Sequence, residues 1–233
     1  MPTTMQRRSF LRVALAGLGG AAVGVPMSAC GARSSSDPQS NPDRGSQPSQ
    51  SDGGRILLAC FSRPGENYWN GGRRNLEVGN TEVLARKISA RLGCDVHRIE
   101  AADPYPDDYE ETVQRNVREQ DADARPAIAN PLASIDEYDT ILLASPIWNV
   151  RAPMIMTTFA ENHDFSGKTV HPVTTHAMSG LGTTPDDYAR SCRGARIGTG
   201  LAVRGEQARS ADADVDSWLR RTGLRDGRAR ASE

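Results

Sequence analysis

Hydroxyl, glycine and amide residues gather around the start of one predicted helix. Ser62 and Arg63 follow the short apolar run Ile56–Phe61, and Gly79-Asn80-Thr81 opens an amphipathic segment further along the chain. A helix N-terminus presents N–H groups without partners inside the helix, and its dipole favours negative charge. Because Ser62 and Thr81 add hydroxyl donors, we expect the two stretches to form the halves of a phosphate site. Arg63 either adds a positive charge to that site or lies on the surface, and the sequence leaves both open.

Aromatic and polar residues follow a second apolar run, Thr140–Ala144, in the segment Ser145-Pro146-Ile147-Trp148-Asn149. A continuous apolar run of this kind is typical of a parallel strand covered on both faces, so the segment stands at a strand end. The Trp148 indole can stack on a flat ligand there, or pack in the core beneath the loop. Pro146 before it and the polar Asn149 after it favour a position at the rim of a pocket.

A third segment, Thr175–Gly182, follows the next apolar run and is rich in small residues. Ser179, Gly180 and Gly182 supply N–H donors and allow close backbone approach to a ligand, or simply form a flexible glycine loop. His176 either stabilises negative charge on a ligand or hydrogen-bonds a loop carbonyl. Polar groups after three different strands thus predict one shared ligand site.

Neither metal nor acid–base chemistry has a candidate in the sequence. No C-x-x-C pair occurs, and the four histidines lack the spacing of zinc ligands. We therefore expect no metal site and no catalytic residues. Cys60 is predicted to be a buried core thiol, and spacing alone leaves open whether Cys94 and Cys192 pair.

The elements that position these groups alternate regularly after Arg55. Apolar runs predict strands and amphipathic segments predict helices, in the order strand then helix, five times over. This alternation is typical of an open, doubly wound α/β sheet, whose ligands bind at the carboxyl ends of the strands. The predicted strands are 56–61, 94–99, 140–144, 169–175 and 197–203, and the predicted helices are 79–92, 107–119, 153–159, 186–192 and 211–221.

The three polar segments, in this order, resemble the loops of a flavodoxin-type domain that binds FMN. The resemblance covers residues 56–205 and implies a doubly wound five-stranded parallel sheet, order 2-1-3-4-5, with helices on both faces. It also implies a phosphate loop, a loop that holds the flavin ring, and a third loop along the ring's other edge. The FMN-binding residues implied in this way are Ser62, Arg63, Gly79, Asn80, Thr81, Pro146, Ile147, Trp148, Asn149, His176, Ser179, Gly180 and Gly182.

Two departures from the family pattern stand out. Asn149 and Val150 occupy positions where many relatives carry a second aromatic residue or a glycine. The segment Pro64–Val78 is inserted between the halves of the phosphate loop and contains adjacent aromatics, Tyr68 and Trp69. The insertion is either a lid or partner surface near the ring, or a hairpin that packs its aromatics onto the domain.

The resemblance implies an FMN-dependent oxidoreductase that passes electrons or hydride through the flavin, with NAD(P)H or a quinone-type compound as substrate. An electron carrier without its own substrate and a cofactor-free binding lipoprotein are the alternatives. Five of the 28 basic and three of the 29 acidic residues precede Arg55, which leaves 23 against 26, a net charge of −3. A charge this close to balanced predicts no nucleic-acid partner. It also disfavours the electron-carrier alternative, because electron carriers of this type usually attract their partners through a strongly acidic face.

The N-terminal residues predict export. Residues 1–30 contain the pair Arg7-Arg8 followed by an apolar run, which matches a twin-arginine signal or an ordinary signal peptide with adjacent arginines. Met27-Ser28-Ala29-Cys30 resembles a lipoprotein cleavage site, which implies lipidation at Cys30 and a lipid anchor in the membrane. We expect a disordered linker over 31–54, a folded domain over 55–224 and a disordered tail over 225–233. The predicted location is the extracytoplasmic face of a bacterial membrane, or a secreted form.

Overall fold

The computed structural model describes residues 55–224. The predicted signal segment 1–30 with Cys30, the linker 31–54 and the tail 225–233 lie outside the described residues. Within 55–224, none of the helices has the length and apolar character needed to cross a membrane.

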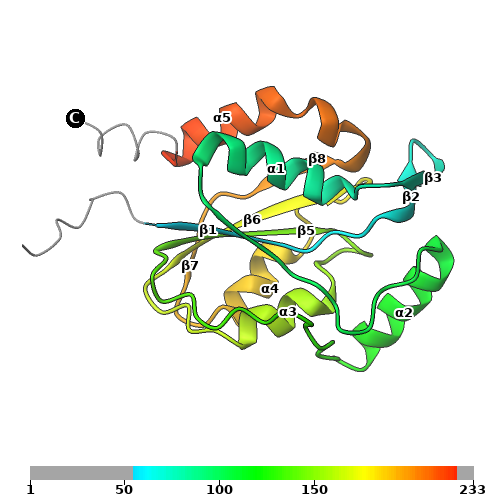
Figure 1. The fold of residues 1–233 in the computed structure, drawn as a ribbon, viewed down its shortest axis with the longest axis horizontal. Coiled ribbons are helices and arrows are strands. Elements are labelled where there is room, and N and C mark those ends of the chain that lie inside the picture. Colours follow the sequence, from blue (N-terminus) through cyan, green and yellow to red (C-terminus); the bar gives the residue numbers. More distant parts are fainter. Residues whose placement is uncertain (1–54, 225–233) are drawn as a thin grey trace, which may run out of the picture. The chain divides into compact units, whose positions relative to one another are not determined.

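A parallel sheet forms the centre of the fold, with helices on both of its faces (Figure 1). Its strands lie in the order β4-β1-β5-β6-β7, and β8 pairs with β6 beyond the end of β7. When only the strands of this sheet are numbered in chain order, and β7 and β8 together count as the fifth, the order is 2-1-3-4-5. The predicted topology is therefore confirmed. The strands are β1 (Ile56–Cys60), β4 (Asp95–Arg98), β5 (Thr140–Pro146), β6 (Thr169–His176), β7 (Arg196–Ile197) and β8 (Leu201–Arg204).

The fifth predicted strand, 197–203, is wrong as one continuous strand, because residues 198–200 leave the sheet between β7 and β8. The carbonyl of Thr199 accepts hydrogen bonds from His171 Nδ1 (3.0 Å) and Trp218 Nε1 (2.9 Å). A Cβ on Gly198 would lie closer than 3.0 Å to the His171 ring. The buried imidazole and indole therefore bind the Thr199 carbonyl, while the Gly198 N–H still donates to the Val170 carbonyl of β6 (2.8 Å).

Four of the described helices cover the sheet, with α1 and α5 on one face and α3 and α4 on the other, whereas α2 lies beyond the carboxyl end of β1 (Figure 1). The helix starts differ from prediction by more than one residue in two places. The helix predicted at 107–119 begins at Tyr109, because Asp108 accepts from the Glu111 N–H (2.8 Å) and so caps it. The helix predicted from Asp186 begins at Thr184. The bounds are α1 (Asn80–Leu92), α2 (Tyr109–Asp121), α3 (Met154–Glu161), α4 (Thr184–Ser191), α5 (Asp212–Thr222) and the 3₁₀ helix η1 (Gly205–Ser210).

Alternate side chains of β1 point to opposite faces of the sheet and belong to two separate hydrophobic cores. Leu57 and Ala59 pack against α3 and α4, whereas Leu58 and Cys60 pack against α1 and α5. Both faces of β1 are therefore buried, as its continuous apolar run predicts. Cys60 is buried as expected, and burial raises the pKa of its thiol to about 12. Cys192 is also a buried thiol and forms no disulfide with Cys94.

The inserted segment folds as a separate antiparallel hairpin of β2 (Gly65–Trp69) and β3 (Gly72–Leu76). Asn70 and Gly71 both have positive φ, 46° and 87°, which is the pattern of a two-residue hairpin turn. Figure 1 shows the hairpin and α2 at the same end of the sheet, beyond the carboxyl end of β1.

Candidate functional site

The two halves of the predicted phosphate loop meet at the start of α1. Ser62 Oγ accepts a hydrogen bond from the Glu82 N–H (3.1 Å), so it caps the helix from outside. Gly79 is the residue before the first helical turn, and a Cβ there would lie closer than 3.0 Å to both Ser62 Oγ and the Arg63 carbonyl. Glycine is therefore required for the loop of β1 and the start of α1 to pack together.

The first turn of α1 offers donors to a ligand. Glu82 N–H is taken by Ser62, and Val83 N–H donates to the Gly79 carbonyl (3.2 Å). This leaves the N–H groups of Asn80 and Thr81 without a partner among the described residues. The Thr81 and Thr175 hydroxyls share one hydrogen bond of 2.6 Å, so one hydroxyl hydrogen of the pair stays available. Three neutral donors and a helix dipole at one point suit a phosphate group.

These residues border a cavity of about 380 Å³ at the carboxyl ends of the strands. The cavity brings together most of the residues predicted for the site. It is lined by the predicted residues Ser62, Arg63, Asn80, Thr81, Pro146, Ile147, Trp148, Asn149 and His176, while Gly79 supports it from behind.

Three predicted residues, Ser179, Gly180 and Gly182, lie outside the cavity. The Ser179 hydroxyl donates to the Asn149 carbonyl over a long 3.5 Å, and Thr174 Oγ1 donates to the Gly180 carbonyl (3.0 Å). Gly182 packs so closely on the Val150 carbonyl that no Cβ would fit. The loop therefore lies against the 149–150 turn, and of its described residues after His176 only Ala177 lines the cavity.

Arg63 is not on the surface, which was one of its two predicted places. Its side chain is buried, and its guanidinium donates to the carbonyls of Pro106 (2.7 Å), Asp107 (3.0 Å) and Glu66. Burial lowers the pKa of the guanidinium, and neighbouring carboxylates of which Asp107 is the foremost oppose that effect. Arg63 thus joins the hairpin to the segment before α2, although it also borders the cavity.

The hairpin is held against α2 and forms part of the cavity wall. The Glu66 N–H donates to the Asp107 carbonyl (2.8 Å), and Glu66 Oε2 accepts from the Tyr109 N–H (3.3 Å). The guanidinium of Arg73 stacks on the Tyr109 ring at 3.5 Å. Tyr68 lines the cavity, whereas Trp69 stacks under Arg74 at 4.5 Å. The insertion is therefore a hairpin packed on the domain, with one aromatic turned to the site.

One face of α2 forms a cavity wall that the sequence analysis missed. Its lining residues recur every three or four positions, which is the spacing of one helix face. That spacing, with two valines in an otherwise charged segment, was a usable signal. The additional α2 residues are Tyr109, Thr112, Val113, Asn116 and Val117, and the other unpredicted lining residues include Asn67, Tyr68, Thr175, Gly205 and Glu206.

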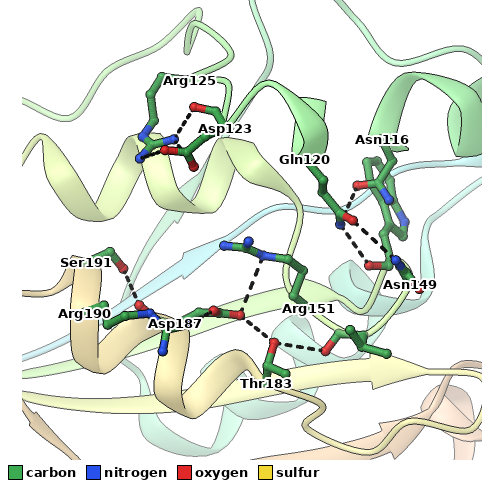
Figure 2. Close-up of polar contacts among 12 residues, drawn as sticks. Asn116, Gln120, Asp123, Arg125, Asn149, Arg151, Thr183, Asp187, Arg190 and Ser191 are labelled. Carbon is green, nitrogen blue, oxygen red and sulfur yellow. Dashed lines mark hydrogen bonds and ion pairs between the residues drawn. The ribbon is translucent and has the colours of Figure 1, made fainter. Parts of the chain in front are cut away.

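Trp148 is half-buried and combines both of its predicted positions. Its indole makes edge contacts with Phe61 (5.7 Å) and Tyr105 (4.9 Å) at the border of the core, and it also lines the cavity. Gln120 on α2 holds its backbone, because Gln120 Nε2 donates to the Trp148 carbonyl (3.3 Å). Figure 2 shows Gln120 beside Asn149, the next residue. The neighbouring Asn149 has a φ of 64°, in the left-handed region.

The segment after Trp148 is fixed to α4. The Thr183 N–H donates to the Val150 carbonyl (2.8 Å), and Thr183 Oγ1 donates to Asp187 Oδ2 (2.7 Å). The Arg151 guanidinium lies 3.6 Å from the same carboxylate. Figure 2 marks this contact with a dashed line. The loop that carries Trp148 is thereby held between α2 and α4.

His176 and Glu206 place two further polar groups at the cavity. His176 Nδ1 and Glu206 Oε2 are buried, and neither has a hydrogen-bond partner among the described residues. Burial lowers the pKa of His176, and Arg204 lowers it further, while Glu206 acts in the opposite direction. The neutral imidazole is therefore favoured. Within residues 55–224, no three His, Cys, Asp or Glu side chains gather where they could hold a metal ion.

A parallel sheet in this order, with a ligand-sized cavity at the carboxyl ends of its strands, defines a flavodoxin-like α/β protein. A sequence model of the flavodoxin family matches residues 76–222. The chain therefore belongs to the flavodoxin family. The comparison with curated proteins gives no match.

Solved structures agree with this fold. A protein from Bacteroides eggerthii assigned as a flavoprotein is 28% identical, covers 73% of this chain and 98% of its own, and has a TM-score of 0.59. A second, from Bacteroides uniformis, is 28% identical with a TM-score of 0.57 and covers 72% and 99%. A Lactobacillus acidophilus flavoprotein in complex with FMN is 18% identical with a TM-score of 0.50, covers 71% and 98%, and supports the fold alone.

Proposed function

We propose that this protein binds FMN in the cavity and works as a flavin-dependent oxidoreductase. The observation that carries the proposal is that one cavity has helix N–H donors at one wall and the Trp148 ring at another. Its volume of about 380 Å³ is within the range of small-molecule sites. Membership of the flavodoxin family and the FMN complex of the Lactobacillus protein support the choice of flavin.

The donors at the start of α1 would hold the phosphate. The N–H groups of Asn80 and Thr81 and the free hydroxyl hydrogen of the Thr81–Thr175 pair would satisfy its oxygens, and the helix dipole would favour its charge. No guanidinium is needed, since Arg63 is engaged with backbone carbonyls.

The far side of the cavity would hold the ring. Trp148 offers an aromatic surface, and Val113 and Val117 on α2 present apolar side chains that would exclude water. When bound, FMN supplies the exchange of electrons or hydride with a donor such as NAD(P)H or a quinone-type compound. The protein's part is to orient the ring and control access to it.

Fluorescence titration of FMN and riboflavin tests the binding site. Riboflavin has the same ring but no phosphate, so FMN should bind at least about a hundredfold more tightly, through several charge-assisted hydrogen bonds. Ser62→Ala removes the Glu82 cap and should weaken FMN more than riboflavin. FMN fluorescence that stays unquenched at about 10 μM protein would exclude an FMN site of useful affinity.

Rapid mixing with NADH and NADPH tests the enzymatic part of the proposal. The FMN-loaded protein should lose its visible flavin absorbance with one of the two nucleotides and regain it with an acceptor. If neither nucleotide bleaches the flavin and a quinol also fails, the protein is an electron carrier and not an oxidoreductase.

We also propose that the domain is exported and anchored by lipid at Cys30, as the residues Arg7-Arg8 and Met27–Cys30 indicate. Cys30→Ser should release the protein from the membrane fraction without blocking export. Replacement of Arg7 and Arg8 by lysine should leave the precursor in the cytoplasm. An unchanged distribution in both variants would contradict the proposal.

A further inference from the structure

The α2 wall contains one buried amide whose hydrogen-bond donors are unused. Asn116 is only 3% exposed and lines the cavity. Its Oδ1 accepts a hydrogen bond from Gln120 Nε2 (3.2 Å), one helical turn further on. Its Nδ2 has no partner among the described residues. Because Asn116 lines the cavity, an acceptor on a bound ligand can pair with this donor.

The orientation of this amide is fixed by its neighbours. Gln120 Nε2 uses one hydrogen for Asn116 Oδ1 and the other for the Trp148 carbonyl, and Gln120 Oε1 accepts from Asn149 Nδ2 (3.4 Å). Figure 2 shows the amides of Asn116, Gln120 and Asn149 joined in this way. If Asn116 turned over, its NH₂ group would face the NH₂ group of Gln120. The donors of Asn116 are therefore held away from Gln120, and each amide in the chain polarises the next.

The surroundings of Asn116 define what it can recognise. Val113 and Val117 flank it on α2, and Trp148 is held to the same helix through Gln120. A ligand here meets the apolar side chains of α2, the Trp148 ring and the Asn116 amide. This combination suits a flat, largely apolar ring system that carries a carbonyl oxygen at its edge.

We propose that Asn116 donates from Nδ2 to a carbonyl oxygen on the pyrimidine edge of the flavin ring. This proposal rests on the proposed FMN site. It makes α2 the cavity wall that recognises the polar edge of the flavin ring. The loop with Ser179, Gly180 and Gly182 lies outside the cavity, whereas Asn116 lies inside it. Gln120 acts as a positioning residue, because it holds both the Asn116 amide and the Trp148 backbone.

Binding of FMN and riboflavin by Asn116 variants tests this contact. Asn116→Ala should weaken both ligands by about tenfold, the usual effect of losing one buried hydrogen bond, and should leave their affinity ratio unchanged. Asn116→Asp keeps the acceptor for Gln120 but turns an oxygen towards the ligand, so it should weaken both by about a hundredfold. Gln114→Ala, an exposed amide on the same helix, is the matched control and should bind both ligands as the native protein does.

A vibrational measurement separates a ring contact from a structural role. Loss of a hydrogen bond strengthens a carbonyl bond, so a flavin carbonyl stretching band of bound FMN should move to higher frequency in Asn116→Ala. Gln120→Leu should move the same band part of the way. A band that stays in place would overturn the contact even if affinity falls.

The two proposals fail in distinguishable ways. If the native protein binds neither FMN nor riboflavin, the proposed function is wrong and the Asn116 contact falls with it. If the native protein binds FMN and Asn116→Ala binds both ligands within about twofold of it, FMN binding stands and the Asn116 contact is wrong.

Discussion

Arg63 shows how a side chain can border a cavity while its hydrogen bonds go to the backbone of the surrounding loops. Its guanidinium joins the carbonyls of Glu66, Pro106 and Asp107, so it holds the hairpin to the segment before α2. No side-chain pattern reveals such partners, because every one of them is a backbone carbonyl. The sequence could place Arg63 beside the predicted phosphate loop, but it could not show which groups its guanidinium binds.

Arg63→Lys should therefore act on stability. Lysine cannot reach three carbonyls in the same geometry, and we expect the free energy of unfolding to fall by about 1–3 kcal/mol in urea titrations. The ratio of FMN to riboflavin affinity should stay unchanged. A loss confined to FMN would show instead that Arg63 contacts the phosphate.

Glu206 places a carboxylate in the same cavity as the phosphate donors. Its neighbour Gly205 packs against the Asn80 side chain, and the Arg204 guanidinium lies 3.8 Å from Glu206 Oε1. Because two negative charges repel, Glu206→Gln should bind FMN about three- to tenfold more tightly and leave riboflavin unaffected. Glu77→Gln, the same change at an exposed position, is the control. Weaker FMN binding by Glu206→Gln would contradict this placement of the phosphate.

Among the elements, the start of α1 depends on one glycine. Gly79→Ala would drive a Cβ into Ser62 Oγ and the Arg63 carbonyl, so we expect about 1–3 kcal/mol of destabilisation and strongly weakened FMN binding. Gly72→Ala is a matched control, since the nearest atom to its Cβ would be a carbonyl at 3.7 Å. Calorimetric melting with FMN titration measures both effects. A Gly79→Ala protein that binds FMN normally would show that the start of α1 tolerates a Cβ at this position.

The hairpin and α2 were harder to anticipate than the sheet. The Asn70-Gly71 pair is a strong turn signal, but the strands beside it are polar and lack the alternation that marks a half-buried strand. The cavity face of α2 mixes valines with Thr112 and Asn116 in a charged segment, so its pattern is weak. Only the folded chain brings these elements next to the loops after β1 and β5.

At the scale of the whole domain, the strand order and the site edge could be predicted from the sequence. Strands such as β1 and β5 are buried on both faces, which makes them continuous apolar runs, and the order of the polar loops then places the site. The break between β7 and β8 could not be predicted, because it depends on His171 and Trp218, which are distant in sequence and share the Thr199 carbonyl.

Stability should fall below neutral pH because burial lowers the pKa of every histidine in the domain, namely His97, His163, His171 and His176. The unfolded chain takes up these protons near pH 6.5 and the folded chain at lower pH. The histidine contribution is therefore complete above pH 6.5 and is lost as the pH falls towards the lowered values. Each proton contributes a slope of up to about 1.4 kcal/mol per pH unit.

Urea titrations between about pH 7.5 and 5.5 measure this slope. His171→Gln keeps a donor for the Thr199 carbonyl and removes one titrating group, so it should flatten the dependence. An equally steep dependence in His171→Gln would show that this histidine does not contribute to it.

The central claim is that one cavity holds the FMN phosphate at α1 and the ring between Trp148 and α2. A crystal structure of the protein grown with FMN tests it most directly. We predict phosphate oxygens within hydrogen-bond distance of the Asn80 and Thr81 N–H groups, and the ring beside Trp148 with a carbonyl oxygen at Asn116. Flavin bound elsewhere, or a phosphate away from the start of α1, would contradict the account.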